Sequence, residues 1–337
     1  MIDWLKLRLD LPAVGRIPGD RVLLLSPDGA VKWEKVKPIA VRGSFESDIH
    51  VSACAYTGKL IIDGNPAKFF QGHNVFGSEN IGGLARALCW YVLGRVPLPV
   101  TEAHREDVHQ GNVEVMRVDV TQSYSMGNVA NARAAVRALA ETATLRHRGR
   151  GSLVQEGTAY WGQHSRRSAL KVYPKGPELQ RHPLPEELHQ VNQVRAFADD
   201  LVRFELVLRV MELRDRGLNV LRAWDENTTT AIYREFLAKF NVPPNVELPV
   251  PCVETLPPRL RLAYDSWMRG TDLRATLPPR TFWRYRKQLL EHGVDIVTVK
   301  PASNVVPLVR ILEAVPAGVP EWAMGTPLYF DPALRAA

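Results

Sequence analysis

The stretch VEVMRVDVTQSY (Val113–Tyr124) decides the fold, because apolar and polar residues alternate along it. Successive side chains of a strand point to opposite faces, so Val118 and Val120 share one face while Arg117 and Asp119 share the other. One face is therefore expected to pack on a core, and the other to carry charge.

A second stretch, LVRFELVLRV (Leu201–Val210), repeats this pattern. Its alternation directs Phe204 and Leu206 toward the core and Arg203 and Glu205 toward the opposite face. Strands with one apolar and one polar face are typical of antiparallel sheets.

Further strands and helices are expected around these two stretches. The strands are MIDWLKLRLDL (1–11), RVLLLS (21–26), SDIHVSACAY (47–56) and KLIIDG (59–64). One helix is expected over roughly 81–93, and another after Asn128, whose side chain can cap VANARAAVRALAETATL. These elements predict an α+β fold, with a mostly antiparallel sheet and flanking helices.

The composition changes in the last third of the chain. Six of the sixteen residues from Pro243 to Pro258 are proline, which is typical of a stiff linker. We therefore expect a large domain over 1–240, a linker over 241–258 and a smaller helical C-terminal region over 259–337.

The C-terminal region contains a basic amphipathic helix, PPRTFWRYRKQLLEHGVDI (Pro278–Ile296). Together with the preceding SWMRGTDLRATL it is typical of a helix-turn-helix-like unit that binds DNA. The alternative is a solvated basic helix face without DNA contacts. The residues predicted to contact DNA are Arg280, Arg284, Arg286 and Lys287.

The composition limits the possible partners and compartments. The net charge of +7 over 337 residues favours a polyanionic partner. Three cysteines, odd in number and far apart, fit a reducing compartment. The longest apolar run, ALCWYVL (87–93), is too short to span a bilayer. We expect a cytoplasmic protein that does not bind membranes.

The stretch SRRSALKVYPKGPEL (Ser165–Leu179) contains a tyrosine at the end of an alternating strand. Alternation places Lys171, Tyr173 and Lys175 on one face, although Pro174 is expected to end the strand. Two neighbouring ammonium groups should let the phenol ionise more readily than a free tyrosine. Such a phenolate could attack phosphorus. The alternative is a tyrosine that simply packs over the sheet.

The two carboxylates on the polar strand faces allow two interpretations. Asp119 and Glu205 could form ion pairs with Arg117 and Arg203. Alternatively, they could hold Mg²⁺ or Mn²⁺, which prefer hard oxygen ligands. His73, alone in its loop, is expected to have a structural role.

Several blocks occur together in an order that identifies a family. The opening MIDWLKLRL, the blocks NPAKFFQGHNVFG and RVDVT, and then SRRSALKVYPKGPELQ, LVRFE, PRTFWRY and ASNVVPLVR follow one another along the chain. This series resembles the gene II replication initiators of filamentous phages, which are rolling-circle nicking-joining proteins.

The resemblance implies roles for particular residues. Tyr173 would be the covalent nucleophile and Lys175 a further catalytic residue, while Asp119, Glu205 and Glu178 would hold Mg²⁺ or Mn²⁺. Origin DNA, duplex and single-stranded, would be the partner, together with a host helicase and polymerase in the bacterial cytoplasm. The residues predicted to contact DNA near the tyrosine are Arg166 and Lys171. A DNA-binding regulator without catalysis is the alternative function.

Overall fold

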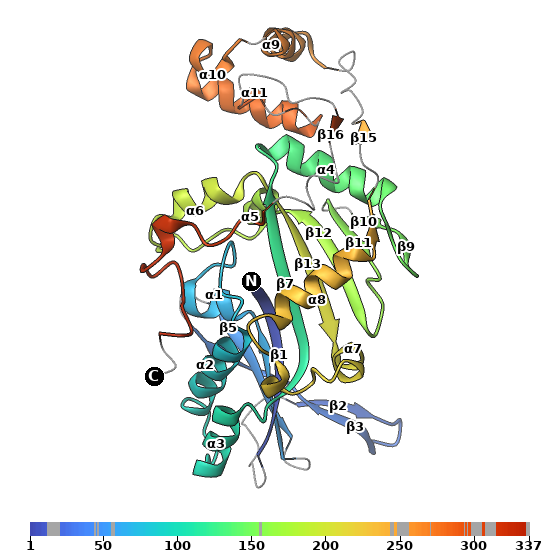
Figure 1. The fold of residues 1–337 in the computed structure, drawn as a ribbon, viewed down its shortest axis with the longest axis vertical. Helices are drawn as coiled ribbons and strands as arrows, with labels where there is room; N and C mark the ends of the chain where they lie inside the picture. The colour runs from blue at the N-terminus through green and yellow to red at the C-terminus, as the bar shows by residue number, and fades with distance from the viewer. Residues whose placement is uncertain are drawn as a thin grey trace.

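The computed structural model describes residues 1–11, 21–43, 45, 47–54, 58–154, 157–242, 246–247, 256–269, 271–292, 294, 296–297, 305–306 and 315–334. Within these residues the largest sheet has nine strands, and each neighbouring pair is antiparallel (Figure 1). In spatial order they are β10 (Ser152–Val154), β11 (Thr158–Trp161), β12 (Ser168–Pro174), β13 (Leu201–Arg209), β7 (Glu114–Ser125), β1 (Ile2–Asp10), β6 (Lys59–Gly64), β5 (Asp48–Cys54) and β4 (Ile39–Arg42).

Helices flank the sheet and also form a separate unit near the C-terminus, so the predicted α+β fold is confirmed. The helices of the sheet domain are α1 (Pro66–Gln71), α2 (Ile81–Leu93), α3 (Glu102–Gln110), α4 (Val129–Thr142), α5 (Lys175–Arg181), α6 (Val191–Ala198), α7 (Val210–Asp215) and α8 (Thr228–Ala238). The C-terminal helices are α9 (Pro258–Met268), α10 (Leu273–Thr276) and α11 (Pro279–Glu291).

One face of the sheet forms the main core. Val118 and Val120 of β7 and Phe204 and Leu206 of β13 lie on this face, as the alternation predicts, and pack with residues of α2, α4 and α8. Helix α4 begins where the sequence predicts, because the Asn128 side chain accepts a hydrogen bond from the Asn131 backbone at 2.8 Å. These helices therefore cover the apolar face of the sheet, and the functional site lies on the polar face.

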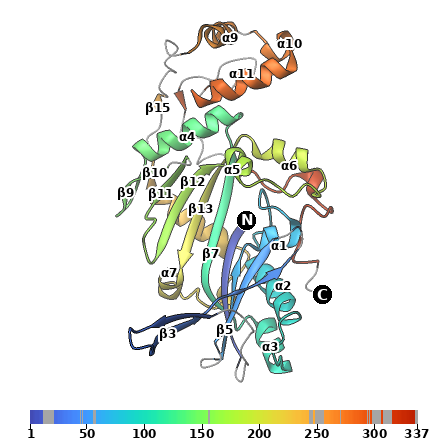
Figure 2. The same cartoon turned by 180° about the vertical axis from the view of Figure 1, so that it is seen from behind.

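The polar face is covered only at one end. Figure 2 shows this face, with α5, α6 and the C-terminal segment 315–334 gathered at the end of the sheet where β12 and β13 meet α5 and α6. Residues of α6 pack there with Ala323 and Leu328 of the returning segment. Along the rest of this face Asp119, Thr121 and Glu205 are buried, whereas Arg117 and Lys171 are partly exposed, and the site lies beside the covered end.

The C-terminal helices have a small core of their own. Phe282 and Leu289 of α11 are buried there with residues of α9 and α10, which confirms the predicted amphipathic helix. The predicted region 259–337 is not a single unit, because segment 315–334 leaves these helices and packs on the sheet domain. Within the predicted linker 241–258, residues 243–245 and 248–255 lie outside the described residues.

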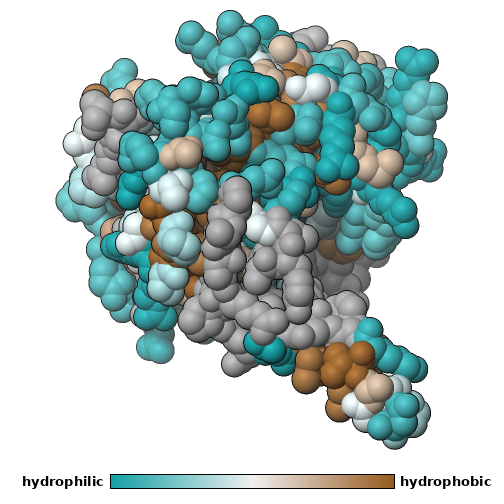
Figure 3. Space-filling view, turned by 90° about the horizontal axis from the view of Figure 1, so that it is seen from below, coloured by the Kyte–Doolittle hydropathy of each residue, from teal (hydrophilic) through white to brown (hydrophobic). Residues whose placement is uncertain are grey.

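Several short strands complete the fold. A hairpin of β2 (Arg21–Leu25) and β3 (Val31–Val36) projects from the body and carries exposed apolar side chains, as Figure 3 shows at its lower right. Its exposed apolar residues are Val22, Leu23, Leu24, Leu25 and Val31. The other short pairs join β8 (Thr144–Leu145) to β9 (Gly149–Arg150) and β14 (Phe240–Asn241), and β15 (Val246–Glu247) to β16 (Val305–Val306).

Among the described helices none is both long and apolar enough to cross a membrane.

Candidate functional site

The register of three strands brings the predicted residues together on the polar face. On β12 and β13, Lys171 lies opposite Glu205 and Tyr173 lies opposite Arg203. On β7, Thr121 lies opposite Glu205. Residues directly opposite one another in an antiparallel pair have side chains within contact distance. The sheet therefore places the tyrosine, the lysine and one predicted acid side by side.

Tyr173 is buried but directly contacts a carboxylate. Its side chain is 3% exposed, and its hydroxyl donates a hydrogen bond to Glu205 Oε2 at 3.1 Å. The Lys171 ammonium lies over the phenol ring, 4.5 Å from its centre. Burial raises the pKa of Tyr173 well above its usual value, and the charge of Glu205 raises it further. The expectation that this phenol ionises readily is therefore wrong for the protein without substrate.

Asp119 forms the ion pair that the sequence left open. Its carboxylate accepts two hydrogen bonds from Arg117, at 2.8 Å from Nε and 2.6 Å from Nη2. Burial nevertheless raises the pKa of Asp119 to about 7, and the charge of Glu205 contributes to the rise. Two buried carboxylates that repel each other favour a cation between them.

One interpretation of the sequence paired Glu205 with Arg203, and this pairing is wrong. The two Glu205 oxygens instead accept hydrogen bonds from Lys171 Nζ at 3.3 and 3.2 Å. We call Arg117, Asp119, Lys171, Tyr173 and Glu205 the outer cluster. Its two cations are partly exposed, Arg117 by 37% and Lys171 by 28%.

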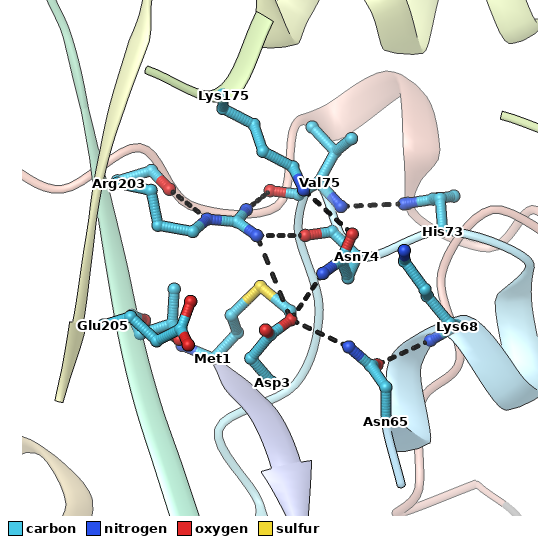
Figure 4. A network of polar contacts seen from close by, with 12 residues as sticks. Met1, Asp3, Asn65, Lys68, His73, Asn74, Val75, Lys175, Arg203 and Glu205 are labelled. Atoms are coloured by element: carbon cyan, nitrogen blue, oxygen red, sulfur yellow. Dashed lines mark hydrogen bonds and ion pairs between the residues drawn. The ribbon is translucent and has the colours of Figure 1, made fainter. Parts of the chain in front are cut away.

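Arg203 belongs to a second, more deeply buried group of charges (Figure 4). Its guanidinium donates hydrogen bonds of 2.5 Å to the backbone carbonyls of Asn74 and Val75, and one of 3.1 Å to Ser123 Oγ. Asp3 Oδ1 lies 3.9 Å from Arg203 Nη1. Arg203 thus ties the loop between α1 and α2 to β13, β7 and β1.

Lys175 lies on the other side of this group, where β12 passes into α5. Its ammonium donates hydrogen bonds to Asn74 Oδ1 at 2.9 Å and to Glu178 Oε2 at 2.6 Å. Burial, reinforced by the charge of Arg203, lowers the pKa of Lys175 to about 7. We call Asp3, Asn74, Lys175, Glu178 and Arg203 the inner cluster. Its two cations, Lys175 and Arg203, are each 0% exposed.

The start of α5 is held by close packing as well as by charge. The strand ends at Pro174, as expected, so Lys175 begins a helix instead of continuing the strand face. A methyl group on Gly176 would lie 2.8 Å from backbone atoms of Asp199, at the end of α6. Glycine therefore permits the approach that buries Lys175 beneath α6.

Two residues of the inner cluster were missed in the sequence. Asp3 accepts hydrogen bonds from Asn65 at 3.0 Å and from Asn74 at 2.7 Å. Burial raises the pKa of Asp3, but the charges of Arg203 and Lys175 outweigh burial and lower it. Both Asp3 and Asn74 lie in blocks quoted for the family resemblance, MIDWLKLRL and NPAKFFQGHNVFG. Asp3 falls on the alternate positions of this strand that leucine otherwise occupies, Leu5, Leu7 and Leu9, and this was the available signal.

His73 has the structural role expected of it. Its Nε2 hydrogen donates to the Leu328 carbonyl at 2.9 Å, and its Nδ1 accepts from the Val75 backbone at 3.2 Å. Burial lowers the pKa of His73 to about 4. The neutral ring therefore attaches segment 315–334 to the loop that carries Asn74.

The predicted metal ligands do not form one set. Among the described residues there is no group of three or more His, Cys, Asp or Glu side chains that could hold a metal ion. Glu178 belongs to the inner cluster, whereas Asp119 and Glu205 belong to the outer one. Thr121 lies on the same face as both and has a buried hydroxyl without a hydrogen-bond partner in the described structure. The oxygens of Asp119, Glu205 and Thr121 are of the type that a hard cation such as Mg²⁺ prefers.

The residues predicted to bind DNA lie in three places. Lys171 is part of the outer cluster, whereas exposed Arg166 lies in the turn between β11 and β12, at the far end of β12 from Tyr173. On α11, Arg280, Arg284 and Lys287 are exposed and Arg286 is half-buried. Figure 1 shows α11 on the other side of α4 from the sheet.

Comparison with known proteins places the chain among phage proteins. Residues 1–227 match the family model for the N-terminal part of a phage replication-associated protein, and residues 257–327 match the model for its C-terminal part. The chain is 36% identical to the replication-associated protein of Enterobacteria phage I2-2, over 95% of both chains. It is 25% identical to the replication-associated protein of Enterobacteria phage M13, over 82% of this chain and 78% of the relative. The chain therefore belongs to this family of phage replication-associated proteins, the gene II family.

Proposed function

We propose that this protein initiates rolling-circle replication of phage DNA by nicking and rejoining the viral strand at the origin. The contact between Tyr173 and Glu205 carries the proposal, because it joins a nucleophile to a base within the geometry that such catalysis needs. Membership of the gene II family and the net charge of +7 support DNA as the substrate.

In the proposed reaction, Tyr173 attacks a phosphodiester of the origin strand. A bond forms between the phenol oxygen and phosphorus, and the phenol proton passes to Glu205. The bond from phosphorus to the 3′ oxygen breaks, and the 3′ oxygen takes up a proton from solvent. The products are a 5′-phosphotyrosine and a free 3′-OH, which a host polymerase extends while a host helicase separates the strands. Attack of a 3′-OH on the phosphotyrosine reverses the chemistry and joins the strand into a circle.

The residues around Tyr173 have separate roles in the proposed reaction. Lys171, which lies over the ring and is the more exposed neighbour, contacts the incoming phosphate. Lys175 acts from below the site by fixing Asn74 and Glu178. Asp119, Glu205 and Thr121 would hold Mg²⁺ or Mn²⁺, which supplies positive charge to the phosphoryl oxygens. The basic face of α11 binds duplex DNA through its phosphates.

A nicking assay tests the nucleophile. Supercoiled DNA with the cognate phage origin is incubated with Mg²⁺ and either native protein or Tyr173→Phe. We expect nicked DNA with a protein-linked 5′ end from the native protein and none from the variant. Tyr160→Phe is the matched control, because Tyr160 lies opposite Lys171 on the neighbouring strand. Nicking that survives Tyr173→Phe but not Tyr160→Phe would transfer the role to Tyr160.

A binding assay tests the metal ligands without relying on activity. Mg²⁺ should raise the melting temperature of the native protein, because a cation relieves the repulsion between two buried carboxylates. The double variant Asp119→Asn, Glu205→Gln should show no such rise, whereas Glu178→Gln should retain it. An equal rise in all three proteins would mean that Mg²⁺ binds elsewhere.

The regulator without catalysis is the weaker candidate. It requires Tyr173 to be buried and distant from the acids, and only the first condition holds, because the phenol donates directly to Glu205. Tight origin binding without nicking by the native protein would favour it.

A further inference from the structure

A cavity of about 450 Å³ lies at the end of β12, on the side of the strand that faces α4, whereas the Tyr173 side chain points to the other side. Pro174, which follows Tyr173 in the chain, forms part of its wall, together with Pro177 and Gln180 of α5. Neighbouring Cα atoms are only about 3.8 Å apart. A molecule in this cavity therefore lies close to the backbone that carries Tyr173.

Three arginines line the cavity. Arg133 and Arg137 come from α4, and Arg181 comes from the last turn of α5. No carboxylate occurs among the described residues that line it. By contrast, the cavity lined by Arg8, Arg214 and Arg222 also contains Asp10 and Glu114, so its walls mix both signs of charge. We call the cavity at the end of β12 the arginine pocket.

Positive charge gathered in a concave site favours an anionic ligand, because the walls concentrate the electric field. Arginine suits phosphate in particular, since its planar guanidinium can donate two parallel hydrogen bonds. The apolar walls, formed by prolines and by Leu153, suit a sugar or a base, and the Gln180 amide can donate and accept hydrogen bonds. This combination of walls suits a nucleotide better than a simple inorganic anion.

The pocket also adjoins the C-terminal helices. Arg133 Nη1 donates a hydrogen bond of 3.5 Å to the Leu290 carbonyl in α11. Figure 1 shows α4 lying between the sheet and α11. A strand in the pocket would therefore lie close to the basic helix α11.

From these observations we infer that the arginine pocket binds single-stranded DNA, holding the strand on one side of the end of β12 while Tyr173 attacks it on the other. The inference rests on the proposed function for the position of the scissile phosphate, but not for binding itself. Single-stranded DNA fits better than duplex DNA, because a concave pocket between two helices admits one backbone and its unpaired bases.

The test measures binding in the absence of chemistry. All proteins carry Tyr173→Phe, and the ligand is a short fluorescein-labelled thymidine oligonucleotide followed by anisotropy at several salt concentrations. Arg137→Ala is the first variant, because Arg137 is exposed on α4 and its loss should not disturb folding. The matched control is Arg105→Ala, on an exposed arginine of α3 at the opposite end of the molecule (Figure 1).

We expect Arg137→Ala to weaken binding about 5- to 10-fold and to reduce the salt slope by about 0.7, the loss of one phosphate contact to a single strand. Arg137→Ala with Arg181→Ala should weaken binding further, and Arg105→Ala should have no effect. Unchanged affinity and slope in the double variant would overturn the inference. Polyglutamate that competes as well as DNA would also overturn it, because the pocket would then select charge alone.

The two proposals fail in different ways. If native protein does not nick the origin, the proposed function fails, while the loss of oligonucleotide binding in Arg137→Ala still supports the pocket. If nicking depends on Tyr173 but the double variant Arg137→Ala, Arg181→Ala binds normally, only the pocket assignment fails.

Discussion

The inner and outer clusters lie beside the same sheet face and each contain two cations and two carboxylates, but they are packed in opposite ways. In the inner cluster, Lys175 and Arg203 are completely buried and bind backbone carbonyls, an amide and carboxylates. In the outer cluster, Lys171 and Arg117 cover buried carboxylates while keeping about a third of their own surface in solvent.

This difference in burial distinguishes cations that hold the fold together from cations that can bind substrate. A buried cation with several fixed partners cannot exchange them for a substrate, because the charge would remain unpaired in a low-dielectric environment. A partly exposed cation can exchange its partner for a phosphate at little cost. The inner cluster therefore holds the loop that carries Asn74, and the outer cluster is available for DNA and a metal ion.

The largest expected effect is the loss of the buried guanidinium. Arg203→Met should destabilise the protein by about 3–5 kcal/mol, because Asp3 and two loop carbonyls would lose a buried partner. Arg203→Lys is the matched variant, since it keeps the charge but cannot donate to both carbonyls at once. Urea unfolding measures both. A loss below about 1 kcal/mol in Arg203→Met would show that the inner cluster is not structural.

The second effect is a pH dependence that arises from His73. Its pKa is lowered to about 4 in the fold by burial, and the nearby charges of Lys175 and Arg203 contribute. The unfolded chain therefore binds a proton between about pH 6.5 and 4 that the folded chain does not. The contribution of His73 to the free energy of unfolding is fully present above pH 6.5. It is lost as the pH falls toward 4, by up to about 3 kcal/mol.

His73→Gln should remove most of this dependence while keeping a donor for the Leu328 carbonyl. Urea unfolding of both proteins between about pH 7 and 4 gives the difference in free energy of unfolding. The difference should shift in favour of the variant as the pH falls. Parallel stability curves would show that the imidazole titrates normally and that its burial has no energetic consequence.

The sequence predicts the framework better than the partners of each charge. Alternation in β7 and β13 correctly assigns which side chains share the polar face, because side-chain direction in a strand depends only on local geometry. The same pattern could not show that Arg203 binds the loop near Asn74 while Glu205 binds Lys171. Those partners depend on how the loop between α1 and α2 folds over the sheet.

Burial explains the remaining error. The sequence shows lysines on both sides of Tyr173, and their charges alone would favour the phenolate. The structure adds burial and the charge of Glu205, which raise the pKa of Tyr173 and outweigh the lowering effect of the nearby Arg203 charge. It also directs Lys175 away from the phenol, since the strand ends at Pro174. Neither effect can be derived from spacing along one strand.

The smallest expected effect on stability comes from replacing Lys171, a cation of the outer cluster. Lys171→Met should change the free energy of unfolding by no more than about 1 kcal/mol, because a partly exposed ion pair contributes little and Glu205 keeps the Tyr173 hydroxyl as a partner. The same substitution should weaken oligonucleotide binding and reduce nicking, since Lys171 is proposed to contact the phosphate.

Comparison with Arg203→Met by urea unfolding therefore separates the two clusters by experiment. Replacing a cation that acts in the reaction should lower activity with little loss of stability. Replacing a cation that holds the fold together should lower both. If Lys171→Met lost several kcal/mol and Arg203→Met did not, the assignment of the two clusters would have to be reversed. The residues that bind DNA beside Tyr173 would then have to be sought beneath the loop that carries Asn74.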